Sequence, residues 1–240
     1  MSQHISRKEL KQDKIAETLV HGVEAVGSHQ KQLWMIGGAV LVILLAVFGW
    51  QFYSERQTVK ATAELEEAMK IFNARIRAAG EPEEPGETTY GEDKFKYMDA
   101  AKKFAEVSAK YSLTRPGQVA RYYAGLSYAQ VGNFAEARKW LGEVESGRDM
   151  EMAALARFQL AKVSAQTGAD AEALKLYQAL IAKPTNMVPK QVSMMALADH
   201  YARKNPAEAL KLYTQIKTEF PDTAASDQAE QRLLELKPKS

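Results

Sequence analysis

The phrase "AEALKLY" occurs twice in this chain, at residues 171–177 and again at residues 207–213. A weaker copy, "AEARKWL", stands at residues 135–141, so the three copies begin 36 residues apart. A fixed interval of this length is typical of folds built from repeated helix–turn–helix units. We therefore expect each copy to begin the second helix of one such unit.

Turn signals divide the surrounding chain into short helices. Breaks rich in Gly, Pro and Asn separate stretches in which apolar residues recur at helical spacing, and no run alternates as a strand requires. The pattern predicts an all-α domain without a sheet over residues 92–240. The expected helices are residues 94–111, 118–131, 134–144, 151–167, 170–182, 190–203, 206–219 and 223–236.

The spacing of small and aromatic residues within these units resembles the tetratricopeptide repeat. The residues that carry the resemblance are Gly125, Tyr128, Gly132, Phe134, Ala137 and Leu141 in the first clear unit, Ala161, Gly168, Ala173, Tyr177 and Leu180 in the next, and Ala209, Tyr213, Ile216 and Pro221 in the last. The resemblance implies a solenoid of stacked helix hairpins. An unrelated helical bundle is the alternative.

The alanines of the repeated phrase have a packing role in this interpretation. Ala137, Ala173 and Ala209 would lie where two antiparallel helices approach closely, because a larger side chain there would wedge the helices apart. The last unit departs from the family pattern, since Leu197 and His200 stand where a small residue and a Tyr are expected. These departures predict that the geometry of the last hairpin differs from that of the family, and they leave the family resemblance itself in place.

Stacked hairpins leave a surface along their first helices that is available to a partner. Steps of 36 residues predict a mostly apolar groove there, which suits a helix or an extended peptide of a protein partner. Packing between repeats is the alternative role for each of these residues. The expected groove residues are Tyr122, Leu126, Phe158, Lys162, Met194 and Tyr201.

A long apolar segment precedes the repeats. Residues 33–53 contain no charged side chain, and as a helix they would span roughly 30 Å, the thickness of the hydrocarbon layer of a bilayer. Aromatic residues stand at both ends, where the membrane interface favours them: Trp34, Trp50, Phe52 and Tyr53. We interpret the segment as an uncleaved transmembrane helix; a buried core helix and a cleavable signal peptide are the alternatives.

The flanks of this segment complete the expected domain organisation. Residues 1–32 form an N-terminal tail with an apolar stripe over residues 15–26, and residues 54–91 form a membrane-proximal helix followed by an acidic loop. That helix is expected to continue to Ala79 and to end at Gly80, and to pair with the helix at residues 94–111. The basic residues of the tail favour a cytoplasmic N-terminus, which would place the repeat domain in the periplasm.

No motif points to catalysis or to a cofactor. Nucleotide-binding loops, nucleophile elbows and metalloprotease motifs are absent from the sequence, there is no Cys, and the four His residues are scattered. The formal net charge of +2 shows no clustered basic excess of the kind that nucleic-acid binding requires. We expect no enzyme activity, no cofactor, no metal site, no small-molecule substrate and no nucleic acid, and the sequence leaves the oligomeric state open.

One tail, one membrane span and a tetratricopeptide-like domain together resemble the bacterial inner-membrane ancillary subunit family of the Sec translocon. The resemblance implies a scaffold in the cell envelope that binds translocation components or periplasmic chaperones through its groove. The alternative hypothesis is an oligomerising structural or assembly factor in cell division or envelope organisation. The absence of a G-x-x-x-G pair in the span disfavours that alternative.

Overall fold

The computed structural model describes residues 30–78, 80–82 and 86–236, with side chains from residue 34 onward. The chain divides into two compact units, Met1–Arg56 and Gln57–Ser240. The expected apolar stripe of the N-terminal tail lies outside the described residues. The described residues form nine helices. The first of them crosses the boundary between the two units, and the other eight belong wholly to the second unit.

The first described helix, α2 (Gln30–Phe72), contains the long apolar segment. Among the described residues it is the one helix that is long and apolar enough to cross a membrane, and none of its apolar window is buried. The four expected interface residues are all exposed: Trp34, Trp50, Phe52 and Tyr53. At the C-terminal end of the segment the Arg56 guanidinium lies over the Phe52 ring, 4.3 Å from its centroid.

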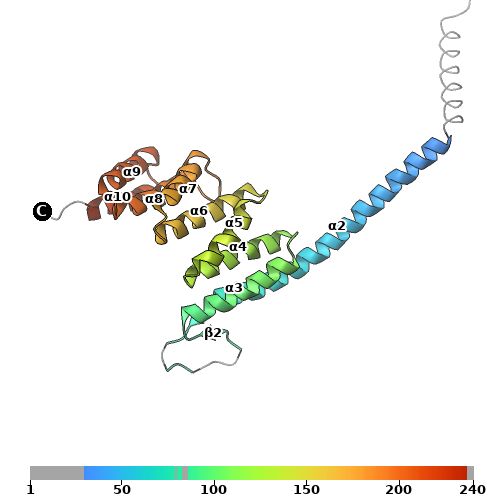
Figure 1. Cartoon of the computed structure of the whole chain (residues 1–240), viewed down its shortest axis with the longest axis horizontal. Coiled ribbons are helices and arrows are strands. Elements are labelled where there is room, and N and C mark those ends of the chain that lie inside the picture. Colours follow the sequence, from blue (N-terminus) through green and yellow to red (C-terminus); the bar gives the residue numbers. More distant parts are fainter. Residues whose placement is uncertain (1–29, 79, 83–85, 237–240) are drawn as a thin grey trace, which may run out of the picture. The chain divides into compact units, whose positions relative to one another are not determined.

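The second unit is an array of helix hairpins (Figure 1). Each helix packs against the next one in the sequence, so that first and second helices of the hairpins alternate along the array. The helices are α3 (Asp93–Lys110), α4 (Arg115–Gln130), α5 (Phe134–Glu145), α6 (Met150–Gln166), α7 (Asp170–Ala182), α8 (Lys190–Ala202), α9 (Pro206–Glu219) and α10 (Ala224–Leu236). Their bounds lie within three residues of those expected from the turn signals.

Polar side chains fix the starts of several helices. The Asp149 carboxylate, for example, accepts hydrogen bonds from the backbone N–H groups of Glu151 and Met152 and so caps α6. Such caps satisfy backbone donors that have no partner inside the helix. Thr114, Asn133 and Asn205 cap α4, α5 and α9 in the same way.

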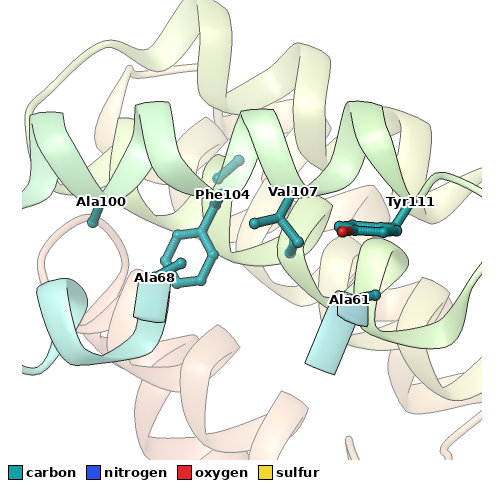
Figure 2. Packing of buried hydrophobic residues seen from close by; sticks show 8 residues of the cluster. Ala61, Ala68, Ala100, Phe104, Val107 and Tyr111 are labelled. Carbon is teal, nitrogen blue, oxygen red and sulfur yellow. The ribbon is translucent and has the colours of Figure 1, made fainter. Parts of the chain in front are cut away.

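The last turns of α2 pair with α3 as the sequence predicts. Ala61 and Ala68 of α2 are fully buried, and Figure 2 shows Ala68 beside Phe104 of α3 and Ala61 beside Tyr111. Small side chains on α2 therefore let the aromatic residues of α3 fill the space between the two helices. The C-terminal part of α2 thus supplies the first helix of the first hairpin.

The structure corrects the expected course of the chain after this hairpin helix. α2 ends at Phe72 and does not reach Ala79, and a two-residue strand follows, so the prediction of a helix up to Ala79 was wrong, whereas residues 92–236 contain no strand. Strand β1 (Arg75–Ile76) pairs in parallel with β2 (Thr89–Tyr90) at the end of the acidic loop.

Ion pairs connect this segment to the acidic loop. The Arg75 guanidinium lies 2.7 Å from a Glu81 carboxylate oxygen and 3.4 Å from one of Glu87. These carboxylates come from the acidic loop, which folds back toward β1. Helical periodicity cannot report such a partner, because it lies in another part of the chain.

Close helix packing in the repeats follows the small residues. Ala137, Ala173 and Ala209 are fully buried. A Cβ added at Gly125 would lie 2.7 Å from Cγ of Leu141, so that α4 can approach α5 this closely only with Gly at this position. Gly132, in the turn between these helices, has a φ of +75°, a backbone conformation that Gly adopts readily.

Candidate protein-binding groove

A hollow of about 680 Å³ lies among the first helices of the later hairpins. We call it the α6–α8–α10 groove, after the three helices that supply most of its lining. The lining residues used below are Phe158 and Lys162 of α6, Tyr177 of α7, Met195, Asp199 and His200 of α8, and Arg203 directly after α8. Its remaining lining includes several alanines, among them Ala165 and Ala196.

Apolar and aromatic side chains form much of the groove wall. Phe158 and Tyr177 make an edge-to-face contact, with ring centroids 6.1 Å apart. Tyr177 is 2 % exposed, and its burial, assisted by the charge of Asp199, raises the pKa of its hydroxyl to about 12. The Tyr177 side chain therefore stays neutral at physiological pH, and this part of the wall carries no charge.

The charged groups of the groove leave a positive excess. Lys162 and Arg203 are exposed, and neither forms an ion pair within the described residues. The Asp199 carboxylate is already engaged, since it accepts a 2.6 Å hydrogen bond from the Tyr213 hydroxyl and lies 3.4 Å from Nε of Arg232. The groove therefore combines apolar walls with two cations that can meet carboxylates of a ligand.

His200 is the one imidazole of the groove among the described residues. It is 5 % exposed, and burial lowers its pKa, although the nearby Asp170 carboxylate acts in the opposite direction. Nε2 lies 3.4 Å from an oxygen of Asp170, which also pairs with Lys204, whereas Nδ1 is buried without a hydrogen-bond partner in the described part of the chain. The lowered pKa keeps the ring neutral near pH 7.

Of the six residues expected to line a groove, the structure places two in the α6–α8–α10 groove and four elsewhere. Phe158 and Lys162 line the α6–α8–α10 groove. Tyr122 is buried, with its hydroxyl 3.4 Å from the Gln159 amide nitrogen, and Leu126 packs against the same apolar cluster between α4 and α6. Met194 is 1 % exposed.

Tyr201 is half-buried and packs against two apolar clusters, one that contains Ala173 of α7 and one that contains Ala209 of α9. None of these last four residues lines the groove.

A one-residue shift in α8 explains where the groove residues of that helix lie. Steps of 36 residues from Phe158 and Lys162 reach Met194 and Ala198, which are buried, whereas steps of 37 reach Met195 and Asp199, which line the groove. The segment between α7 and α8 is longer than the equivalent segment between α5 and α6, so α8 is displaced along the sequence relative to the other first helices.

The same shift restores the repeat pattern of the last hairpin. Ala198 is fully buried in one cluster with Ala209 and Tyr213, which is the environment expected for the small residue of a first helix. Leu197 instead packs toward the preceding hairpin, in the cluster of Ala173. The departures noted at Leu197 and His200 thus disappear when the small and aromatic positions are assigned to Ala198 and Tyr201.

Two of the remaining expected packing residues, Tyr128 and Tyr213, lie at interfaces between helices. Tyr128 stacks on Trp140 with ring centroids 6.5 Å apart, and Tyr213 is fully buried. Pro221 lies exposed just after α9. Sequence reasoning missed Met195, Asp199 and Arg203 as groove residues; a signal for them was available in the longer segment before α8.

Comparison with known proteins identifies the family. A family model described as a tetratricopeptide repeat-like domain matches residues 30–184, from the start of α2 to just beyond the end of α7. No curated protein and no solved structure matches the chain. The matched part is well over half of the chain, and the protein belongs to the tetratricopeptide repeat-like family.

Proposed function

We propose that the protein is a membrane-anchored scaffold that holds a segment of another protein in the α6–α8–α10 groove. Stacked helix hairpins present extended surfaces to protein partners, and grooves of this kind accept amphipathic helices or extended peptides. The observation that carries the proposal is the groove itself, with its apolar walls and two unpaired cations, Lys162 and Arg203.

The apolar part of α2 supplies the anchor in this proposal. Its length and composition suit a bilayer, and the family match includes it together with the first hairpins. An anchor confines the scaffold to the membrane plane and raises its effective concentration near membrane complexes. Following the resemblance to the Sec ancillary family, we place the protein in the bacterial inner membrane with the repeats in the periplasm, where translocation components or chaperones are the partners.

Photo-crosslinking in intact membranes tests the scaffold proposal. A photoreactive residue in place of Gln191 or Gln228, which both line the groove, should form crosslinks to a defined protein partner. The double variant Lys162→Glu/Arg203→Glu should abolish these crosslinks, because it reverses the charge of both free cations. Lys175→Glu is the matched control, since Lys175 is an exposed cation of α7 outside the groove lining.

The outcomes separate the proposed scaffold from other functions. Crosslinks that persist unchanged in the charge-reversed variant would contradict the groove as the binding site. Crosslinks only between copies of this chain would favour an oligomerising assembly factor. Protease treatment of sealed inner-membrane vesicles tests the orientation, because a periplasmic repeat domain is protected in inverted vesicles and digested in right-side-out spheroplasts.

A further inference from the structure

The segments between the end of the preceding helix and the first residue of α4, α6 and α8, that first residue included, each expose one large apolar side chain. Leu113 is 83 % exposed, Met150 81 % and Met187 57 %, and the three residues are spaced at 37-residue intervals. Exposed Leu and Met side chains occur singly on most proteins and need no explanation. Their recurrence near the start of the first helix in successive hairpins is different, because it builds a row.

Contacts within the second unit place the three segments along one edge of the array. The backbone N–H of Met187 donates a 2.8 Å hydrogen bond to the Glu151 carboxylate, so the third segment adjoins the start of α6 beside Met150. A hollow of about 390 Å³ is lined by Gln118 of α4 and by Arg148, which joins the second segment to the start of α4. We call this row the entry edge.

Each segment of the entry edge also carries an exposed cation. These cations are Arg115, Arg148 and Lys183, and none of them forms an ion pair in the described part of the chain. Two carboxylates stand close by in sequence, but both are used locally: Asp149 caps α6 and Glu151 accepts backbone N–H groups of the third segment. The entry edge therefore combines protruding apolar side chains with three exposed cations that form no ion pair in the described residues.

The chain enters the second unit at this same edge. The Glu64 carboxylate of α2 accepts a 2.7 Å hydrogen bond from the Tyr111 hydroxyl and pairs with Lys110 at 2.5 Å, so the end of α3 lies level with Glu64. Seven residues of helix, about 11 Å, separate Glu64 from Gln57, the first residue of the unit. Only residues 54–56 lie between Gln57 and the apolar segment.

We propose that the entry edge lies on the surface of the bilayer, with its apolar side chains in the interfacial region and its cations on anionic lipid headgroups. The inference rests on the proposed anchor in α2. Apolar side chains beside Lys and Arg are the chemistry that proteins use to lie on anionic membranes. The turns at the other end of the first helices, residues 131–133, 167–169 and 203–205, expose no large apolar side chain.

A consequence for the groove follows from this contact. Contact of the entry edge with the bilayer would set how far the repeat array extends from the lipid. α4 alone spans about 24 Å from one edge of the array to the other. The α6–α8–α10 groove would then face partners at a set distance from the lipid, where a segment emerging from a membrane complex can reach it.

Single cysteines allow a direct test, because the chain contains no cysteine of its own. The full-length protein is reconstituted in vesicles of phosphatidylcholine and phosphatidylglycerol, with a fluorophore on Leu113→Cys or on Met150→Cys. Lipid with a spin-labelled headgroup should quench both labels strongly. Labels on Gln130→Cys and Ala171→Cys, two exposed sites at the other edge, are the matched controls and should be quenched weakly.

Charge reversal tests the electrostatic part of the contact. Each cation near an anionic surface contributes about fivefold to the contact equilibrium, so Arg115→Glu/Arg148→Glu should lower it by at least about 25-fold. Raising the salt from 0.1 M to 1 M shortens the Debye length from about 10 Å to about 3 Å and should reduce quenching in the same direction. Vesicles of phosphatidylcholine alone should show the weaker contact without any substitution.

A label on Val42→Cys, within the apolar segment of α2, separates failure of this inference from failure of the anchor. Quenching of that label by spin-labelled acyl chains, with equally weak headgroup quenching at both edges, would overturn the membrane contact and leave the anchor standing. An unquenched label at Val42 would overturn both. Labels at the entry edge that become shielded only in native membranes would assign the edge to a protein partner and also overturn the proposal.

Discussion

Gly125 offers a sharp test of the helix packing, because two opposing effects of known size meet at one position. In a helix interior, Gly→Ala stabilises by about 1 kcal/mol through backbone entropy. At Gly125, however, the new Cβ would lie 2.7 Å from Cγ and 3.2 Å from the backbone N of Leu141, whose side chain is fully buried. Overpacking of this kind costs about 1–3 kcal/mol.

The clash should therefore outweigh or cancel the gain in helix propensity. Gly125→Ala is expected to lower the free energy of unfolding by about 0–2 kcal/mol. Gly142→Ala is the matched control, since Gly142 also lies inside a helix, α5, but an added Cβ there has nothing within 4 Å. That variant should gain about 1 kcal/mol.

Urea unfolding of the full chain in mild detergent, followed by the helical circular dichroism signal, measures both changes. A double-mutant cycle with Leu141→Ala identifies the cause. Leu141→Ala alone should cost about 2–5 kcal/mol, but in that background Gly125→Ala should become stabilising, because the two side-chain atoms of Leu141 within 3 Å of the new Cβ are gone and only the backbone N, at 3.2 Å, remains. Equal stabilisation by Gly125→Ala and Gly142→Ala in the wild-type background would refute the reasoning.

Three further predictions concern stability. Phe104→Ala should cost about 3–5 kcal/mol by opening a cavity between α2 and α3, and amide hydrogen exchange should rise in α3 while α9 stays protected, since repeats contact only their neighbours. Unchanged exchange in α3 would contradict the assigned core. Gly132→Ala should cost about 1 kcal/mol in urea unfolding, because its φ of +75° suits Gly and strains Ala; a neutral result would show that the turn adapts. For His200, the folded-state pKa lies below the ordinary value of 6.5, so the unfolded chain binds more protons at acidic pH. Its contribution to stability is therefore present above about pH 6.5 and is lost as the pH falls through the folded-state pKa. Thermal unfolding of His200→Gln at pH 7.5 and 5.5 should show a smaller drop in midpoint than the wild-type chain, and an equal drop would contradict the assignment.

The helices of the repeat array and their order could be predicted from the residue pattern alone. Caps and turn residues such as Asn133 and Gly132 act within a few residues of the chain, so their effect on helix bounds can be read locally. The buried alanines of the repeated phrase were predictable for the same reason, because helical spacing fixes which residues share a face. The apolar stretch of α2 was equally plain from composition.

The end of α2 and the position of the groove depend on contacts between parts of the chain that are far apart in sequence, so the residue pattern could not predict them. The strand at Arg75 and Ile76 depends on partners within and at the end of the acidic loop, and pairing across a loop leaves no trace in a local pattern. The groove depends on the displacement of α8 by one residue, which turns Met195 toward the groove and Met194 into the core. One residue rotates a helix face by about 100°, so an interval that is correct for the repeat as a whole still assigns the wrong side chain to a surface.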